Sequence, residues 1–226
     1  MSRTSCIAAL DLSALTDWTL TVRILNRVPP PQLLLLDGST GAGKSLLLRY
    51  LREEYSKSVF VGKKFTTRKK RLGDSDWEFS FLPTIPDRHS SYSFQSVDNN
   101  YAVNIEEARY AVANGFTYVI SCTDRPVTEK LRSEFGTLVV YVYRTLTSSD
   151  LEMIFNSRGL FASKESELRR DEVSSVAVRY LQQLEIYDHV VLNISSELSA
   201  KAQLSTILSL YRIEQDSQLI LGKETL

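Results

Sequence analysis

The sequence is poor in cysteine and has no excess of charge of either sign. Its two cysteines among 226 residues, Cys6 and Cys122, are too few for the disulfide framework of a small secreted domain, so we expect a reducing compartment, the cytoplasm. Twenty-seven lysines and arginines balance 27 aspartates and glutamates. This balance gives no overall field that would favour nucleic acid or an anionic membrane as a partner. Any affinity for phosphate must therefore come from a local group of basic residues.

Long hydrophobic runs are also missing. No apolar stretch approaches the roughly 20 residues that span a bilayer, and Asp11 ends the apolar residues 6–10 too early for the core of a signal peptide. Glycine and proline are scarce, at nine and six residues, whereas 43% of the residues are hydrophobic. This composition excludes a disordered chain and predicts one sizeable core, with room for a small appended lobe.

Short apolar runs alternate with amphipathic ones after three prolines at residues 29–31. Four leucines at residues 33–36 are too few for a buried helix and predict a central parallel strand covered on both sides. Further strands are expected at residues 116–122, 138–143 and 190–192. Helices are expected at residues 44–55, 105–113, 127–135, 149–157 and 196–212. The helix at 149–157 is expected to have Ser148 or Ser149 as its N-cap. A further long helix is expected to follow the charged residues 163–171 and to end at residue 184. This alternation predicts an α/β fold with a parallel sheet flanked by helices.

A glycine-rich stretch, GSTGAGKS at residues 38–45, joins the first strand to the first helix. It fits the pattern G-x-x-x-x-G-K-[ST] in the strand-to-helix context that this pattern requires, and an ordinary glycine-rich turn is the alternative. Glycines let successive backbone N–H groups turn toward one anion, and the helix N-terminus adds partial positive charge. Lys44 can reach the terminal phosphates of ATP, and the Ser45 hydroxyl can ligate Mg²⁺. The predicted ATP site comprises Gly38, Ser39, Thr40, Gly41, Ala42, Gly43, Lys44 and Ser45.

A second motif, KFTTRKKRLGD at residues 64–74, follows about 20 residues after the glycine-rich loop. Its two arginines, Arg68 and Arg71, can clamp a phosphate through forked, charge-assisted hydrogen bonds that lysine cannot reproduce. Taken alone, the motif could also be a solvated basic loop. Together with the preceding loop, the pattern T-T-R-x-x-R-x-G-[DE] resembles the guanylate kinases.

Weaker matches extend this resemblance from about residue 33 to about residue 212. They include NYA at residues 100–102, RG at 158–159 and DHVVLN at 188–193. The resemblance implies a P-loop sheet with a small lobe that holds a phosphorylated acceptor, and a helical lid. The acceptor-binding residues that it implies are Lys64, Arg68, Arg71, Trp77, Tyr101 and Asp124, and it adds Asn193 to the ATP site.

Lid arginines have a clear chemical task in such a kinase. A γ-phosphoryl group in transfer spreads negative charge over its oxygens, and cations on a closing lid stabilise that charge and exclude water. The resemblance implies Arg158 and Arg169 for this role, so that the predicted catalytic residues are Lys44, Arg158 and Arg169. For Arg169, a solvated helix face among Glu165 and Glu172 is the alternative.

Several positions depart from the guanylate kinase pattern. Lys64 stands in place of a phosphate-binding serine, and no glutamate near residues 92–94 could read the base. Val103 replaces a serine or threonine, and SCTD at residues 121–124 replaces an acidic pair. Asp124 could serve in a shifted position or simply cap the next helix. Because guanine presents N–H donors that a carboxylate would accept, we expect weak discrimination of this base.

Two function classes remain open. The first is a kinase that uses ATP and Mg²⁺ on a small phosphorylated acceptor such as a nucleoside monophosphate, with GMP as the family's usual acceptor. The second is a guanylate kinase-like binding module that holds a phosphorylated partner without turnover. We expect an N-terminal extension at 1–31, a guanylate kinase-like domain at 32–216 with an acceptor lobe at about 63–104 and a lid at about 156–172, and a tail at 217–226. The oligomeric state stays open.

Overall fold

The computed structural model describes residues 29–160, 163–194 and 196–216. Most of the predicted N-terminal extension, including Cys6, and the predicted tail lie outside these described residues.

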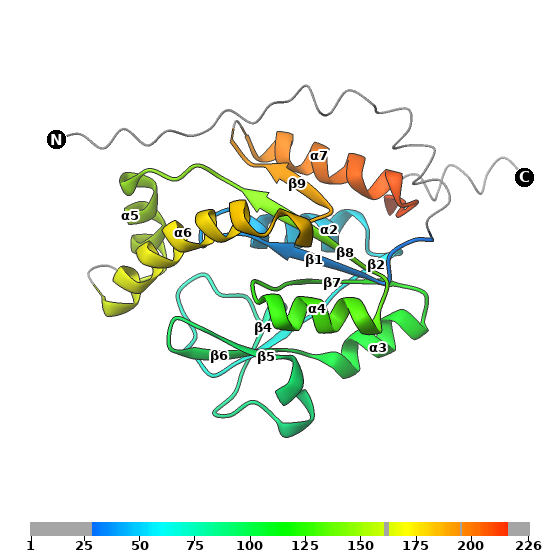
Figure 1. The fold of residues 1–226 in the computed structure, drawn as a ribbon, viewed down its shortest axis with the longest axis horizontal. Coiled ribbons are helices and arrows are strands. Elements are labelled where there is room, and N and C mark those ends of the chain that lie inside the picture. Colours follow the sequence, from blue (N-terminus) through cyan, green and yellow to red (C-terminus); the bar gives the residue numbers. More distant parts are fainter. Residues whose placement is uncertain (1–28, 161–162, 195, 217–226) are drawn as a thin grey trace, which may run out of the picture.

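The centre of the described chain is a five-stranded sheet with the strand order β2-β7-β1-β8-β9 (Figure 1). All neighbouring strands of this sheet run parallel. The strands are β1 (Leu33–Asp37), β2 (Val59–Val61), β7 (Thr117–Ser121), β8 (Thr137–Tyr143) and β9 (His189–Leu192). The predicted α/β fold class is therefore confirmed, and the four leucines lie in the central strand.

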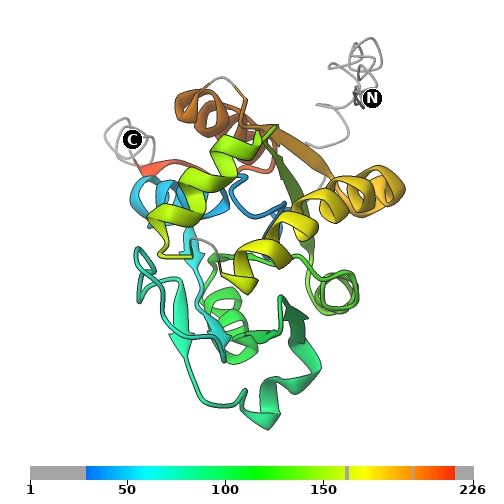
Figure 2. The same cartoon turned by 90° about the vertical axis from the view of Figure 1, so that its left-hand side faces the viewer.

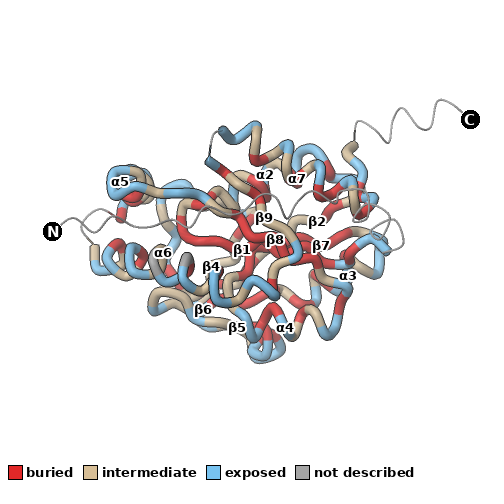
Figure 3. The backbone as a smooth tube through the Cα atoms, turned by 45° about the horizontal axis from the view of Figure 1, so that its top comes forward, coloured by how far each residue is buried: buried red, intermediate tan, exposed pale blue. Residues whose placement is uncertain are grey.

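Helices cover this sheet on both faces. The helices concerned are α2 (Lys44–Glu54), α3 (Ile105–Ala113), α4 (Arg125–Glu134) and α7 (Glu197–Leu210). Leu34 and Leu36 pack in the core cluster formed with α2 and α7, whereas Leu33 and Leu35 pack in the cluster formed with α3 and α4. All four leucines are fully buried, because side chains alternate along a strand and an entirely apolar strand must be covered twice. Figure 3 shows this buried centre along the strands.

A second, four-stranded sheet with the order β4-β3-β6-β5 lies beside the parallel sheet (Figure 1). Its strands are β3 (Lys64–Thr66), β4 (Phe79–Phe81), β5 (Ser93–Ser96) and β6 (Asn99–Val103), with the 3₁₀ helix η2 (Asp87–Tyr92) before β5. The sequence predicts none of these four strands, because strands of three to five residues with polar side chains among the apolar ones show no clear alternation. We call these four strands the small sheet.

Two helices, α5 (Ser148–Ser157) and α6 (Lys164–Gln182), lie at one end of the molecule, followed by η3 (Leu184–Ile186). In Figure 2, both helices lie on the side that faces the viewer, with α6 (yellow to gold) above the small sheet. The N-cap of α5 is Thr147 and not Ser148 or Ser149: its side chain accepts from the N–H of Asp150, whose carboxylate accepts from Thr147 in return. This reciprocal capping box decides the start of the helix. None of the helices in the described ranges is long and apolar enough to cross a bilayer.

Candidate active site

The glycine-rich loop joins β1 to α2, as predicted. Gly43 has φ 105°, and a Cβ at this position would lie 2.4 Å from the side-chain nitrogen of Asn193. Only glycine both adopts this positive φ readily and lacks the Cβ that would clash with Asn193. Asn193 donates a hydrogen bond of 2.9 Å to the carbonyl of Ala42, so the end of β9 holds the loop in place. The side chain of Ala42 is itself buried in the core.

Lys44 bends back over the loop. Its Nζ donates to the carbonyl oxygens of Gly38 and Ser39, the latter at 2.8 Å. Burial lowers the pKa of Lys44 to about 8, an effect that nearby Asp37 partly offsets. The ammonium group is therefore held at the loop in an environment where an added anion would favour its charged form.

Arg68 is fixed by a carboxylate in its own loop. Its guanidinium donates two hydrogen bonds to Asp74, with the Nη2–Oδ1 distance at 2.8 Å, and lies 4.6 and 5.2 Å from the ring centres of Phe79 and Phe81. Asp74 also accepts from the backbone N–H of Arg71 at 2.6 Å. The TTR motif is thus a closed turn around Asp74, and Arg68, only 5% exposed, is held in a fixed orientation.

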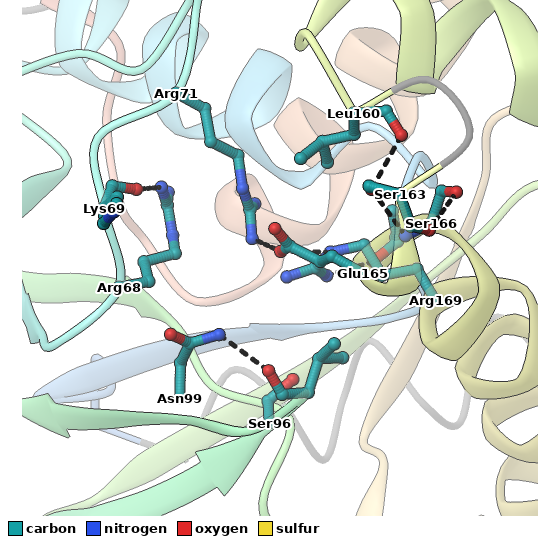
Figure 4. A network of polar contacts seen from close by, with 12 residues as sticks. Arg68, Lys69, Arg71, Ser96, Asn99, Leu160, Ser163, Glu165, Ser166 and Arg169 are labelled. Carbon is teal, nitrogen blue, oxygen red and sulfur yellow. Dashed lines mark hydrogen bonds and ion pairs between the residues drawn. The ribbon is translucent and has the colours of Figure 1, made fainter.

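Arg71 contacts α6, the helix of the predicted lid, through Glu165. Figure 4 shows the Glu165 carboxylate between the guanidinium of Arg71 and that of Arg169, with an ion pair to each. Arg71 belongs to the loop between β3 and β4, which we call the basic loop, and the other two residues belong to α6. One lid carboxylate therefore joins a predicted acceptor arginine to a predicted lid arginine.

Arg169 links the lid to the glycine-rich loop. It is 6% exposed and donates to the hydroxyl of Thr40 at 2.9 Å, so it does not lie on a solvated helix face. Glu172, one turn further along α6, accepts from Thr40 at 3.1 Å and from Ser96 of the small sheet at 2.9 Å. Residues three, four and seven apart lie on one side of a helix, which explains why Glu165, Arg169 and Glu172 all face inward.

The phenol of Tyr101 lies at the centre of this positive charge. Its burial alone would raise its pKa, but Arg68, Arg169, Arg71 and Lys64 outweigh this and lower it. Arg158, the C-cap of α5, has a lowered pKa because it is buried and lies near Arg169. Cations from three separate parts of the chain are therefore concentrated around one point.

These groups line one polar cavity of about 740 Å³. The predicted residues in its lining are Gly38, Thr40, Gly41, Gly43, Lys44, Ser45, Lys64, Arg68, Arg71, Trp77, Tyr101, Arg158, Arg169 and Asn193. Ser39 and Ala42 belong to the loop but do not line the cavity. Trp77 lies at the cavity edge, with Arg52 at 5.3 Å from its ring centre and its ring against the core.

Asp124 is not brought to the cavity. Its carboxylate accepts from the N–H of Val127 at 3.0 Å and caps α4. Of the two interpretations that the sequence leaves open for this residue, the structure supports the helix cap.

Three acidic residues that line the cavity, Asp74, Glu78 and Glu172, and a fourth that contacts Arg71, Glu165, were not predicted as site residues from the sequence. Asp74 is a fixed element of the TTR motif, which could have indicated a role in orienting Arg68. The others are visible in the sequence only as members of charged runs. Glu78 is 6% exposed and accepts from the hydroxyl of Ser45 at 3.1 Å.

Comparisons with known proteins agree with this arrangement. No family model matches the chain. It is 24% identical over 192 residues to guanylate kinases from two strains of Campylobacter jejuni, RM1221 and NCTC 11168, which covers 82% of this chain and 91% and 90% of theirs. A crystal structure of guanylate kinase from Anaplasma phagocytophilum superposes with a TM-score of 0.52 at 16% identity, covering 88% of this chain and 96% of that one. The fold is that of a guanylate kinase.

Within this guanylate kinase fold, the positions that depart from the family pattern form a distinct local arrangement. The Nζ of Lys64 donates to the hydroxyl of Ser121 at 2.6 Å and lies 4.8 Å from the ring centre of Phe79. Ser121 and Thr123 line the cavity where the pattern has carboxylates, and Val103 is buried in the core. Two hydroxyls therefore occupy the places of the acidic pair that would accept from guanine N–H groups, and a buried lysine occupies the place of a phosphate-binding serine.

Proposed function

We propose that the chain is an ATP-dependent phosphotransferase of guanylate kinase type that phosphorylates a small phosphorylated acceptor, such as a nucleoside monophosphate. The observation that carries this proposal is the convergence of three sets of cations on one cavity. Lys44 comes from the glycine-rich loop, Arg68 and Arg71 come from the loop after β3, and Arg158 and Arg169 come from the lid.

The donor binds at the glycine-rich loop in this proposal. The backbone N–H groups of residues 38–45 and the N-terminus of α2 hold its phosphates, and Lys44 reaches the terminal ones. Asn193 keeps the loop in shape through its bond to Ala42. The hydroxyl of Ser45 fits Mg²⁺, because it lines the cavity beside a carboxylate and Mg²⁺ takes oxygen ligands. Bound with ATP, the metal would neutralise charge on the phosphate oxygens.

The acceptor phosphate binds between Arg68, Arg71 and Tyr101. The lowered pKa of Tyr101 supports this, because the surroundings that stabilise a negative phenolate would stabilise a phosphate in the same way. Lys64 adds a fourth donor on the same side. Arg158 and Arg169 then face the γ-phosphoryl group, whose charge they stabilise as it moves. No covalent intermediate on the protein is needed, since position and charge supply the catalysis.

A screen for ADP formation tests this function. The protein would be incubated with ATP, Mg²⁺ and one of a panel of nucleoside monophosphates and sugar phosphates. We expect turnover with at least one acceptor, and its loss in Lys44→Ala, which removes a cavity side chain without opening the core. Unchanged turnover in Lys44→Ala would contradict the proposal.

A binding module is the second candidate function. The observation that favours it is the ion pair of Arg71 with Glu165, which occupies an acceptor arginine from within the chain. Saturable binding of phosphorylated ligands without ADP formation on any acceptor would support this alternative.

The proposal also includes a division of the chain into a domain, a lobe and a lid. Residues 32–216 would form one guanylate kinase-like domain with an acceptor lobe at about 63–104, which contains the small sheet, and a lid at about 156–172. We assign it to the cytoplasm.

A further inference from the structure

We infer that Glu78 is a ligand of the Mg²⁺ that accompanies ATP, supplied from the small-sheet side of the cavity rather than from the ends of the parallel strands. This inference rests on the proposed function, because it assumes that MgATP binds at the glycine-rich loop.

The position of Glu78 is fixed by its backbone. It lies directly before β4, its carbonyl accepts from the N–H of Lys64 at 3.0 Å, and its own N–H donates to the carbonyl of Ser75 at 3.1 Å. These bonds tie it to the first strand of the small sheet, β3, and to the turn before β4. The side chain is 6% exposed and lines the cavity. Glu78 is therefore a buried carboxylate directed from the small sheet toward the glycine-rich loop.

The contact of Glu78 with Ser45 has the spacing of two ligands on one metal. The Oγ of Ser45 lies 3.1 Å from Oε1 of Glu78. In an octahedral Mg²⁺ site with bonds of about 2.0 to 2.1 Å, neighbouring ligand oxygens are about 3 Å apart. Within the described residues, the bond from Ser45 is the side-chain hydrogen bond that Glu78 makes. Both oxygens can thus turn to one cation with little movement.

Other carboxylates near the loop are committed elsewhere. Asp37, at the end of β1, accepts from the N–H of Gly38 and the hydroxyl of Tyr187, each at 2.6 Å. Asp124 caps α4, and the end of β7 supplies Ser121 and Thr123 in place of acids. Among the described residues, Glu78 is the carboxylate in contact with Ser45. Its negative charge would therefore be the one that balances the positive charge of the metal.

The electrostatic effect of Glu78 on a lid arginine is consistent with this role. Glu78 is one of the groups whose charge acts on Arg158, where its effect is to raise the pKa of that arginine, although burial lowers it overall. A metal held between Ser45 and Glu78 would therefore lie on the side of the cavity where the lid arginines meet the terminal phosphate.

Metal-dependent binding of ATP, measured without turnover, tests the inference. The dissociation constant of ATP would be determined by calorimetry in excess Mg²⁺ and in excess chelator, for the full chain and for Glu78→Gln. We expect Mg²⁺ to tighten ATP binding by the wild type, and Glu78→Gln to reduce that tightening by about 10-fold or more, in the range seen when groups around a bound metal are removed. Affinity for metal-free ATP should stay the same or rise, because a negative charge next to the phosphates is removed. A purely structural role would weaken both forms alike.

Asp76→Asn is the matched control. Asp76 lies two residues away in the same turn, carries the same charge, and pairs with Lys70 at the surface, so its loss should leave the Mg²⁺ effect intact. Glu78→Asp, which keeps the charge but shortens its reach, should also lose much of the tightening, and it provides a second test if Glu78→Gln folds poorly.

The outcomes separate this inference from the proposed function. Mg²⁺ tightening that is unchanged in Glu78→Gln and Glu78→Asp would overturn the metal-ligand role and leave the kinase proposal standing. Tightening that depends on Glu78, together with no phosphoryl transfer to any acceptor, would contradict the proposed function alone. A wild type that does not bind ATP under either condition would contradict both.

Discussion

Arg68 illustrates how one residue of the site is held ready for a ligand. Its guanidinium is buried against two aromatic rings and donates a forked pair of hydrogen bonds to Asp74, so its orientation is set without a ligand. We predict that Arg68→Ala weakens acceptor binding by about 2 to 3 kcal/mol, because a charge-assisted forked contact is lost. Asp74→Asn should weaken it less, since the arginine remains but its orientation is less restricted. Equilibrium binding of the acceptor checks both values, and an unchanged affinity in Arg68→Ala would contradict the assignment.

Lys44 provides a prediction about pH. Its pKa of about 8 means that its ammonium group loses its proton in the free protein as the pH rises above 8. Asp37 and Glu172 oppose this loss, whereas Lys64 and Arg158 favour it. Because ATP needs the charged form, we expect its affinity to be highest below pH 8 and to fall above it, by up to roughly tenfold per pH unit.

Lys44→Arg is the control for this pH dependence. An arginine stays protonated throughout the range, so ATP affinity in this variant should not fall between pH 7 and about 9.5. Titration of ATP binding at a series of pH values makes the comparison. The same fall in both proteins would show that another group is responsible.

At the scale of elements, the lid helix α6 connects the parts of the site. Its inner side contacts the glycine-rich loop through Arg169, the basic loop through Glu165 and the small sheet through Glu172. An acceptor phosphate bound at Arg71, as we propose, would compete with Glu165 for the same guanidinium. Movement of α6 and occupation of the acceptor site are therefore expected to be coupled.

The lid arginines should affect turnover more than acceptor binding. We predict that Arg158→Ala and Arg169→Ala each lower kcat by about 10² or more with little change in acceptor affinity, because these cations meet charge that develops during transfer. Arg170→Ala is the control, since Arg170 is half exposed, lies 3.9 Å from Glu152 and does not line the cavity. Steady-state kinetics and thermal melts of the three variants distinguish lost catalysis from lost folding. Wild-type kcat in both lid variants would contradict their role.

Elements with a clear pattern could be predicted from the sequence, and those without one could not. The bounds of α3 agree with the prediction at both ends, because Asn104 caps it and Asn114-Gly115 end it. The strands of the small sheet were missed because each is short, and because β3 pairs with a strand distant in sequence, as in the pairing of Lys64 with Val103. Strands β5 and β6, by contrast, are close neighbours in sequence. Local patterns predict local structure, whereas the place of β3 in this sheet is decided by long-range pairing.

For the whole molecule, the same limit applies to the site. The glycine-rich loop and the TTR motif could be found from sequence because each is a contiguous stretch with a fixed spacing. The carboxylates Glu78, Glu165 and Glu172 could not, because their role depends on which way a loop and a helix turn toward the cavity. A buried acidic residue and a solvated one look alike in a charged run.

Base selectivity is a property of the whole cavity. The hydroxyls of Ser121 and Thr123 and the buried Val103 occupy the places where acceptors for guanine are expected. A site without a carboxylate to pair with the N–H groups of guanine should discriminate GMP from other monophosphates by far less than the roughly 10⁴-fold that a dedicated hydrogen-bonding site reaches. Comparison of kcat/KM for GMP, AMP, CMP and UMP measures this. A strict preference for GMP would show that other residues read the base.

Transfer of the labelled γ-phosphate of ATP to an acceptor tests the central claim most directly, because it separates transfer from hydrolysis. We predict that the wild type, with Mg²⁺ and an acceptor found in the screen, moves the label into the phosphorylated acceptor. Lys44→Ala and Arg158→Ala should form this product at a rate at least about 10² lower. Label that appears only as free phosphate, or equal transfer by the wild type and both variants, would contradict the claim that the cations of the loop, the small-sheet side and the lid act together on one phosphoryl group.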